Sequence, residues 1–141
     1  MTAQDSPVVV GLSHSAASTA AVRYALQEGV RHSCPVRVVH VDDDAEHSDR
    51  PLDQGGTRPM SSQQRLFGRV GDAMSDLGDA AEEMTVSVAR LQGNLEDELT
   101  RAAADARALV VGQPGRCRHA GLDERLRAQV DCPVVVVPAR P

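Results

Sequence analysis

Glycine and arginine residues near the end of the chain form a pattern that could bind phosphate. An apolar run over residues 108–112 ends at Gly112, and Gly115 and Arg116 follow within four positions. Glycines let backbone N–H groups approach a ligand closely, and an arginine fork suits phosphate. A lone G-x-x-G, however, is also an ordinary turn between a strand and a helix. The pattern therefore predicts a candidate phosphate loop whose glycines can be explained without a ligand.

Two carboxylates lie where such a phosphate would bind. Asp123 and Glu124 fall in the first turn of a helix that we predict over residues 122–130. Their negative charges already complement the positive end of the helix dipole. A phosphate at this helix start would face two like charges, which argues against tight binding.

Other polar side chains of chemical interest form no recognisable catalytic set. His40 and the acidic run after it contain metal-ligand types, but we interpret them as a solvated charge run. Cys117 lies between Arg116 and Arg118, which favour its thiolate, so it is the cysteine to test as a redox-responsive thiol. The sequence contains neither a nucleophile elbow nor HExxH, and we predict no catalytic residues and no metal site.

Composition excludes several classes of function. The 141 residues suit a single domain over residues 1–141, and the formal net charge of −5 argues against nucleic acid as a partner. All 15 basic residues are arginine, which excludes mechanisms that need a lysine. Tyr24 and Phe67 are the only aromatic residues, so a flavin-stacking site has little to build with. No apolar run approaches membrane-spanning length, and we expect a soluble, cytoplasmic protein without membrane contact.

Apolar patterning predicts strands and helices in alternation. Valine-rich runs are typical of strands buried on both faces, and apolar residues three and four apart predict helices. We predict strands at residues 7–12, 35–42, 84–89, 108–112 and 134–137, and helices at 15–32, 66–81, 95–106 and 122–130. The alternating pattern at 84–89 favours an edge strand. Asn94 is placed to cap the helix that follows it. Residues 43–60 are predicted to form an exposed, flexible loop.

This order of elements predicts an α/β fold. Right-handed crossovers give an open five-stranded parallel sheet with helices on both faces, in the strand order 3-2-1-4-5 or 2-1-3-4-5. In either order, ligands bind at the carboxyl ends of the strands, where the winding of the sheet reverses.

Several segments, in their order and spacing, resemble the universal stress protein family over nearly the whole chain. The matching segments are VVVGLSHSAASTAAVRYAL, PVRVVHV, VARLQGNLEDELTRAAADARALVVG and ERLRAQVDCPVVVVP. The resemblance implies the Rossmann-like order 3-2-1-4-5, as in adenine nucleotide alpha hydrolase-like folds. The loops after Leu12 and Gly112 would then face each other across one crevice. The resemblance also implies a homodimer that forms through the last strand, at Val134, Val135, Val136 and Val137.

The chain resembles the ATP-binding branch of this family in the first glycines of its motif and departs from it elsewhere. That branch has G-x-x-G, nine residues and then G-(S/T). Gly112 and Gly115 match the first half, but Ala120-Gly121 replaces the second half after a shorter spacer. Ser13 stands where family members tend to carry an aspartate. A shorter loop also offers fewer N–H groups to a triphosphate.

We therefore expect a regulatory stress-response module that is not an enzyme, binds ATP weakly or not at all, and acts through an unidentified protein partner. The alternative is a member that binds ATP or AMP, with slow hydrolysis; we expect no other cofactor. A receiver domain would need acids and a lysine that are missing here, and a flavodoxin-like carrier would need aromatic residues. In the nucleotide-binding alternative the site would be lined by Gly11, Ser13, Val41, Gly112, Gly115 and Arg116, with the backbone of Val41 contacting adenine.

Overall fold

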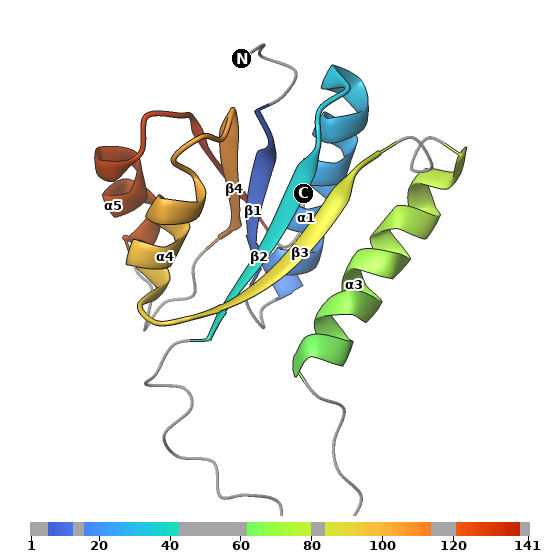
Figure 1. The fold of residues 1–141 in the computed structure, drawn as a ribbon, viewed down its shortest axis with the longest axis horizontal. Helices are drawn as coiled ribbons and strands as arrows, with labels where there is room; N and C mark the ends of the chain where they lie inside the picture. Colours follow the sequence, from blue (N-terminus) through green and yellow to red (C-terminus); the bar gives the residue numbers. More distant parts are fainter. Residues whose placement is uncertain (1–5, 13–15, 43–61, 80–83, 114–120, 139–141) are drawn as a thin grey trace, which may run out of the picture.

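The computed structural model describes residues 6–12, 16–42, 62–79, 84–113 and 121–138. Strands and helices alternate along these segments (Figure 1). None of the helices in these ranges is long and apolar enough to cross a membrane. The strands are β1 (Val8–Leu12), β2 (Val36–Asp42), β3 (Val86–Gln92), β4 (Ala108–Gly112) and β5 (Val134–Val137), and the helices are α1 (Ala16–His32), α3 (Ser62–Leu77), α4 (Leu95–Ala102) and α5 (Leu122–Gln129).

The strands form one parallel sheet in the order β3-β2-β1-β4-β5. This result confirms the order 3-2-1-4-5 and excludes 2-1-3-4-5. β1 is central: Val10 pairs with Val38 of β2 on one side and with Val110 of β4 on the other. β3 is an edge strand, as its alternating pattern predicted, and β5 forms the opposite edge.

Helices cover both faces of the sheet, with α1 and α3 on one face and α4 and α5 on the other (Figure 1). Alternate residues of a strand point to opposite faces, so consecutive valines contribute to two cores. Val8 and Val10 pack toward α1 and α3, whereas Val9 packs with Leu99 of α4 and Leu126 of α5. The unbroken valine runs are therefore explained by burial of the central strands on both faces.

The end of α1 packs tightly against β2. A Cβ atom at Gly29 would lie 2.5 Å from Val36 Cγ2 and 3.1 Å from the carbonyl oxygen of Cys34. The chain turns through Ser33, whose φ is 54°, and the Cys34 N–H donates to the Gly29 carbonyl oxygen at 3.0 Å. The missing side chain at Gly29 is what lets α1 return directly into β2.

The bounds of α3 differ from the predicted helix at residues 66–81. The helix begins at Ser62, four residues before the first apolar residue of its pattern. It ends at Leu77 because Gly78 adopts a left-handed φ of 63°. The predicted loop at residues 43–60 lies outside the described residues.

Two further boundaries are corrected by contacts that link distant parts of the chain. β3 spans Val86–Gln92 rather than residues 84–89, because its pairing with β2 continues as far as Asp42 and Gln92. α4 ends at Ala102 rather than near Ala106. Arg37 of β2 donates to the Ala102 carbonyl oxygen at 3.2 Å and to Asp105 at 3.3 Å, so a cation covers the negative end of this helix.

Candidate functional site

The carboxyl ends of β1 and β4 lie side by side where the sheet reverses its winding, the usual ligand position in this architecture. Gly11 of β1 pairs with Val39 of β2 and Val111 of β4, so Val41 and Gly112 follow just beyond this row. Three of the six predicted nucleotide-site residues, Gly11, Val41 and Gly112, therefore lie near the carboxyl ends of the strands. Ser13, Gly115 and Arg116 lie outside the described residues, as does Cys117.

Packing accounts for the glycine at position 11. A Cβ atom there would lie 2.9 Å from Leu99 Cδ2 and 3.3 Å from Leu99 Cδ1. Leu99 is 1% exposed and belongs to the core between the sheet and α4 and α5. Gly11 thus makes room for a buried leucine, and this role needs no ligand.

The backbone just after β4 also has fewer unused N–H donors for a ligand than its glycines suggest. The N–H of Gln113, the first after Gly112, donates to the Val137 carbonyl oxygen at 2.8 Å and so extends the sheet. The side chain of Val41 is buried in the core, which leaves only its backbone for contact with a ligand. One donor expected at a phosphate loop is therefore already used by β5.

The start of α5 carries compensated charge. Gly121 precedes the helix with a left-handed φ of 78° and provides no side-chain cap. Asp123 and Glu124 occupy the first turn, as predicted. Asp123 Oδ2 forms an ion pair with Arg127 Nη1 at 3.3 Å, one turn further along. The acids supply the negative charge that the helix dipole favours at this end.

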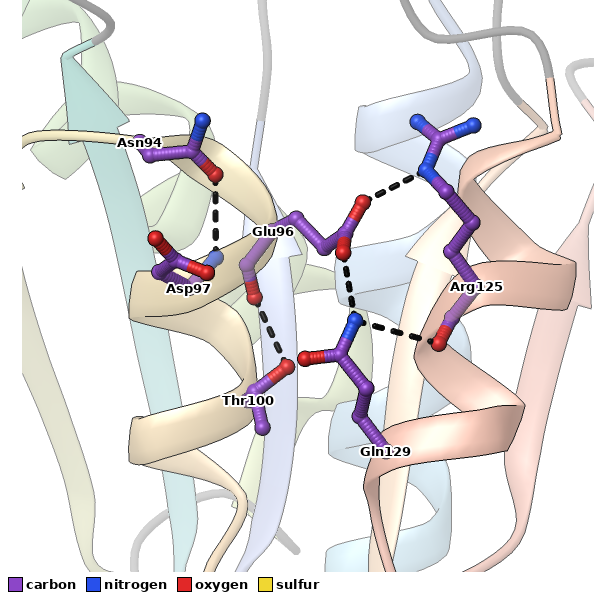
Figure 2. A network of polar contacts seen from close by, with 6 residues as sticks. All are labelled: Asn94, Glu96, Asp97, Thr100, Arg125 and Gln129. Carbon is purple, nitrogen blue, oxygen red and sulfur yellow. Dashed lines mark hydrogen bonds and ion pairs between the residues drawn. The ribbon is translucent and has the colours of Figure 1, made fainter.

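A second polar network joins α4 to α5 (Figure 2). Arg125 Nε donates to Glu96 Oε1 at 2.5 Å, and Gln129 Nε2 donates to Glu96 Oε2 and, at 3.4 Å, to the Arg125 carbonyl oxygen. We call Glu96, Arg125 and Gln129 the α4–α5 bridge. Asn94 Oδ1 accepts from the Asp97 N–H at 3.1 Å, which confirms the predicted cap at the start of α4.

In the α4–α5 bridge, Arg125 forms an ion pair with the carboxylate of Glu96. The hydrogen bond from Arg125, and next the one from Gln129, lowers the pKa of Glu96 below its ordinary value of 4.5. Sequence patterns did not identify the bridge, because its partners are 29 and 33 residues apart and belong to different helices. Only the adjacency of α4 and α5, a property of the fold, brings them together.

The bridge should stabilise the fold in a pH-dependent way. A carboxyl group whose pKa is lowered by folding contributes stability above its unfolded pKa, and this contribution is lost as the pH falls through the folded pKa. A double-mutant cycle with Glu96→Ala and Arg125→Ala should give a coupling of about 0.5 kcal/mol at pH 7, the value usual for partly exposed ion pairs. Urea unfolding at pH 7 and at a series of lower pH values measures it, and the coupling should decline as the pH falls through the folded pKa of Glu96.

The exposed pair Glu98 and Arg101 on α4 provides the matched cycle for this prediction. Their side-chain atoms are 3.4 Å apart, and Arg101 is 76% exposed. Its coupling should be smaller than that of the bridge at pH 7. An equal coupling for both pairs at pH 7, or a bridge coupling that does not decline in acid, contradicts the interpretation.

His40, Cys34 and Cys132 are other described side chains whose type could support metal or thiol chemistry. His40 is buried in β2 and is 4% exposed. Within the described segments, no three histidine, cysteine or acidic residues are placed to hold a metal ion. Cys34 is buried, whereas Cys132 is only partly buried, and this partial burial raises the pKa of its thiol.

Comparison with known proteins identifies relatives of the whole chain. The sequence model of the universal stress protein family matches residues 6–138. Among curated proteins, no match to this chain was found.

Many solved structures with similar folds are universal stress proteins, and their sequence identity to this chain is low. One, in complex with cAMP, is 20% identical with a TM-score of 0.65, and the match covers 96% of this chain and 98% of the other. A universal stress protein from Lactobacillus plantarum is 15% identical with a TM-score of 0.62, over 96% and 99% of the two chains. One from Archaeoglobus fulgidus, in complex with dAMP, is 20% identical with a TM-score of 0.55, over 95% and 98%.

Proposed function

The chain belongs to the universal stress protein family, and on this premise we propose that it is a regulatory stress-response module that is not an enzyme and binds ATP weakly or not at all. The observation that carries this proposal is the charge at the start of α5. Two carboxylates occupy its first turn, and Arg125 and Arg127 both form ion pairs with carboxylates.

Phosphate binding at a helix start depends on unused N–H groups and uncompensated positive charge. A phosphate oxygen about 4 Å from a carboxylate is disfavoured by about 1 kcal/mol in bulk water and about 4 kcal/mol near a protein surface. A triphosphate carries several such charges past Asp123 and Glu124. The short loop and the Gln113 N–H that already donates to β5 reduce the compensating contacts.

A nucleoside monophosphate is the second candidate ligand. Two similar universal stress proteins were solved in complex with cAMP and dAMP. A monophosphate presents one phosphate group to α5, so it meets less repulsion than ATP does. The position of Gly112 and of the Val41 backbone near the reversal of the sheet is consistent with this ligand. We would expect slow ATP hydrolysis only if this nucleotide-binding alternative is correct.

Small molecules carried by the purified protein distinguish these candidates. The protein is denatured and the released molecules are quantified by mass spectrometry. We expect far less than one adenine nucleotide per chain. AMP or cAMP at close to one per chain would favour the second candidate, and ATP at close to one per chain would refute the main proposal.

We also propose that the protein is cytoplasmic, acts through a protein partner and forms a homodimer through β5. The Leu109 and Gln113 N–H groups donate to the carbonyl oxygens of Pro133 and Val137, so these peptide groups point toward β4. By the alternation of a strand, the peptide groups of Val134 and Val136 point toward the open edge. A second copy paired there would protect an apolar edge strand from aggregation.

Proline at position 136 tests the dimer. Val136→Pro removes an N–H that points away from β4, so it should weaken pairing between copies while leaving the hydrogen bonds to β4 intact. We expect a dimer for the unmodified protein and for Val136→Ala, and a monomer for Val136→Pro, by light scattering after gel filtration. A monomeric unmodified protein, or a Val136→Pro variant that remains dimeric, contradicts pairing through β5.

A further inference from the structure

A pocket lies at the opposite end of the sheet from the carboxyl ends of β1 and β4. It has a volume of about 90 Å³ and lies where these two strands begin, between the sheet and α1. At about 3.3 Å per residue, the length of β1 places it roughly 13 Å from the end of that strand. It is lined by Val8, Tyr24, Glu28, His32, Arg107, Ala108, Val110 and Val135.

The floor of this pocket is apolar. Val8 and Val110 are fully buried members of the core under α1, and Val135 of β5 packs partly buried against that core. One wall is a stripe of α1 whose members recur every four residues and so share one face of the helix. The stripe consists of Tyr24, Glu28 and His32, and Arg107 is the other charged residue of the lining.

The polar lining includes one carboxylate, that of Glu28, and one guanidinium, that of Arg107. Glu28 Oε1 accepts from the Tyr24 hydroxyl at 3.0 Å, and its Oε2 lies 3.4 Å from His32 Nε2. A carboxylate has about four acceptor positions, so Glu28 can take a further donor. The Arg107 backbone N–H is held by the Pro7 carbonyl oxygen at 2.9 Å, whereas its guanidinium has no hydrogen bond or ion pair within the described part of the chain.

This arrangement selects against ligands of a single charge. An anion that reaches Arg107 is repelled by Glu28, and a cation that reaches Glu28 is repelled by Arg107. A purely apolar ligand would leave the guanidinium without a partner as water is displaced around it. A small molecule that carries both charges and an apolar end satisfies every part of the lining.

We propose that this pocket binds a free aliphatic α-amino acid of about the size of valine. Its carboxylate pairs with Arg107, its ammonium group donates to Glu28, and its side chain lies on Val8, Val110 and Val135. The volume sets the size: a cavity of about 150 Å³ holds benzene, which has six carbon atoms, so about 90 Å³ suits the three-carbon side chain of valine. This inference is independent of the crevice at the carboxyl ends of the strands.

Titration with L-valine and two truncated analogues tests the charge requirement. 3-Methylbutanoate keeps the apolar end and the carboxylate, and 2-methylpropylammonium keeps the apolar end and the ammonium group. We expect valine to shift the backbone NMR signals of Tyr24, Glu28, Arg107 and Val135, and each analogue to bind at least roughly tenfold more weakly, because one charge-assisted contact is lost. Equal binding of all three compounds would show that the pocket binds apolar groups without regard to charge, and it would overturn the proposal.

Matched variants test the location. Arg107→Met should lower valine affinity by roughly tenfold or more, whereas Arg101→Met, on the other face of the sheet, should not. Val135→Phe should fill the pocket and abolish binding, while Val137→Phe, two residues along the same strand, should retain it. Circular dichroism verifies that each variant is folded. Any of three results would refute the site. The first is the absence of signal shifts at saturating valine, and the second is shifts confined to the carboxyl ends of β1 and β4. The third is unchanged binding by folded Arg107→Met and Val135→Phe.

Discussion

Replacing Gly29 by alanine should destabilise the protein by about 3 kcal/mol, the upper range for a group forced into a well-packed core. The new Cβ atom would lie 2.5 Å from Val36 Cγ2 and 3.1 Å from the carbonyl oxygen of Cys34. Neither neighbour can move cheaply, since Val36 is 1% exposed in β2 and the Cys34 backbone is hydrogen-bonded to Gly29. Urea unfolding followed by circular dichroism measures the loss.

Gly71→Ala is the matched control for this prediction. Gly71 lies within α3, and a Cβ atom there would meet nothing within 4 Å. Alanine is the better helix former, so this variant should be more stable by roughly 0.5–1 kcal/mol. The same substitution in two helices should therefore have opposite signs. Gly29→Ala at or above the stability of the unmodified protein would show that α1 does not pack against β2 in the manner described.

Truncating Leu99 to alanine should cost about 3 kcal/mol, since the side chain is almost completely buried and its removal leaves a cavity. The same substitution should change the cost of Gly11→Ala. A Cβ atom at Gly11 meets Leu99 Cδ2 at 2.9 Å, so Gly11→Ala alone should cost about 1–3 kcal/mol. In the Leu99→Ala background this cost should largely disappear, because the clashing atoms are gone.

Leu126→Ala provides the comparison background. Leu126 belongs to the same core cluster and is fully buried, but none of its atoms is among the three nearest to a Cβ at Gly11. The cost of Gly11→Ala should be unchanged in this background. A cost that is the same in all three backgrounds would mean that Gly11 does not serve Leu99, and a ligand role for its backbone would then regain support.

The sequence predicted the topology well because the topology follows from local patterns. Valine runs that end at glycines identified the buried strands, and the alternation of Val86 and Val88 with polar neighbours identified the edge strand. Asn94 was recognised as a cap from its position before an acidic first turn. The patterns alone left two strand orders open, since the direction in which the sheet winds depends on contacts between distant segments; the family resemblance favoured the correct one.

Long-range contacts account for what the sequence did not reveal. Arg37 reads as one polar residue within a strand, yet it covers the end of α4, 65 residues away. Glu96 looks like a dipole-complementing acid at the start of α4, yet its carboxylate holds Arg125 and Gln129 of α5. Gly11 matched a ligand-binding pattern, while the contact with Leu99 that explains it depends on how α4 packs on the sheet.

The candidate site was predicted only in part for the same reason. The strand order does bring Gly11, Val41 and Gly112 together near the carboxyl ends of the strands, as the topology required. The binding roles of these residues, and those of Ser13, Gly115 and Arg116, remain predictions. The pocket beside Arg107 was not anticipated, because its lining comes from three strands and one helix that share no sequence motif.

A thermal-shift titration with ATP, ADP and AMP in the presence of magnesium tests the central claim most directly. A site with micromolar affinity would add about 4 kcal/mol at millimolar ATP. In a chain of this size, that gain would raise the unfolding midpoint by roughly 10 °C. We predict a rise of less than about 1 °C with ATP, as expected when the ligand concentration does not exceed its dissociation constant. A rise of several degrees at millimolar ATP, lost in Gly115→Asp, would contradict the account.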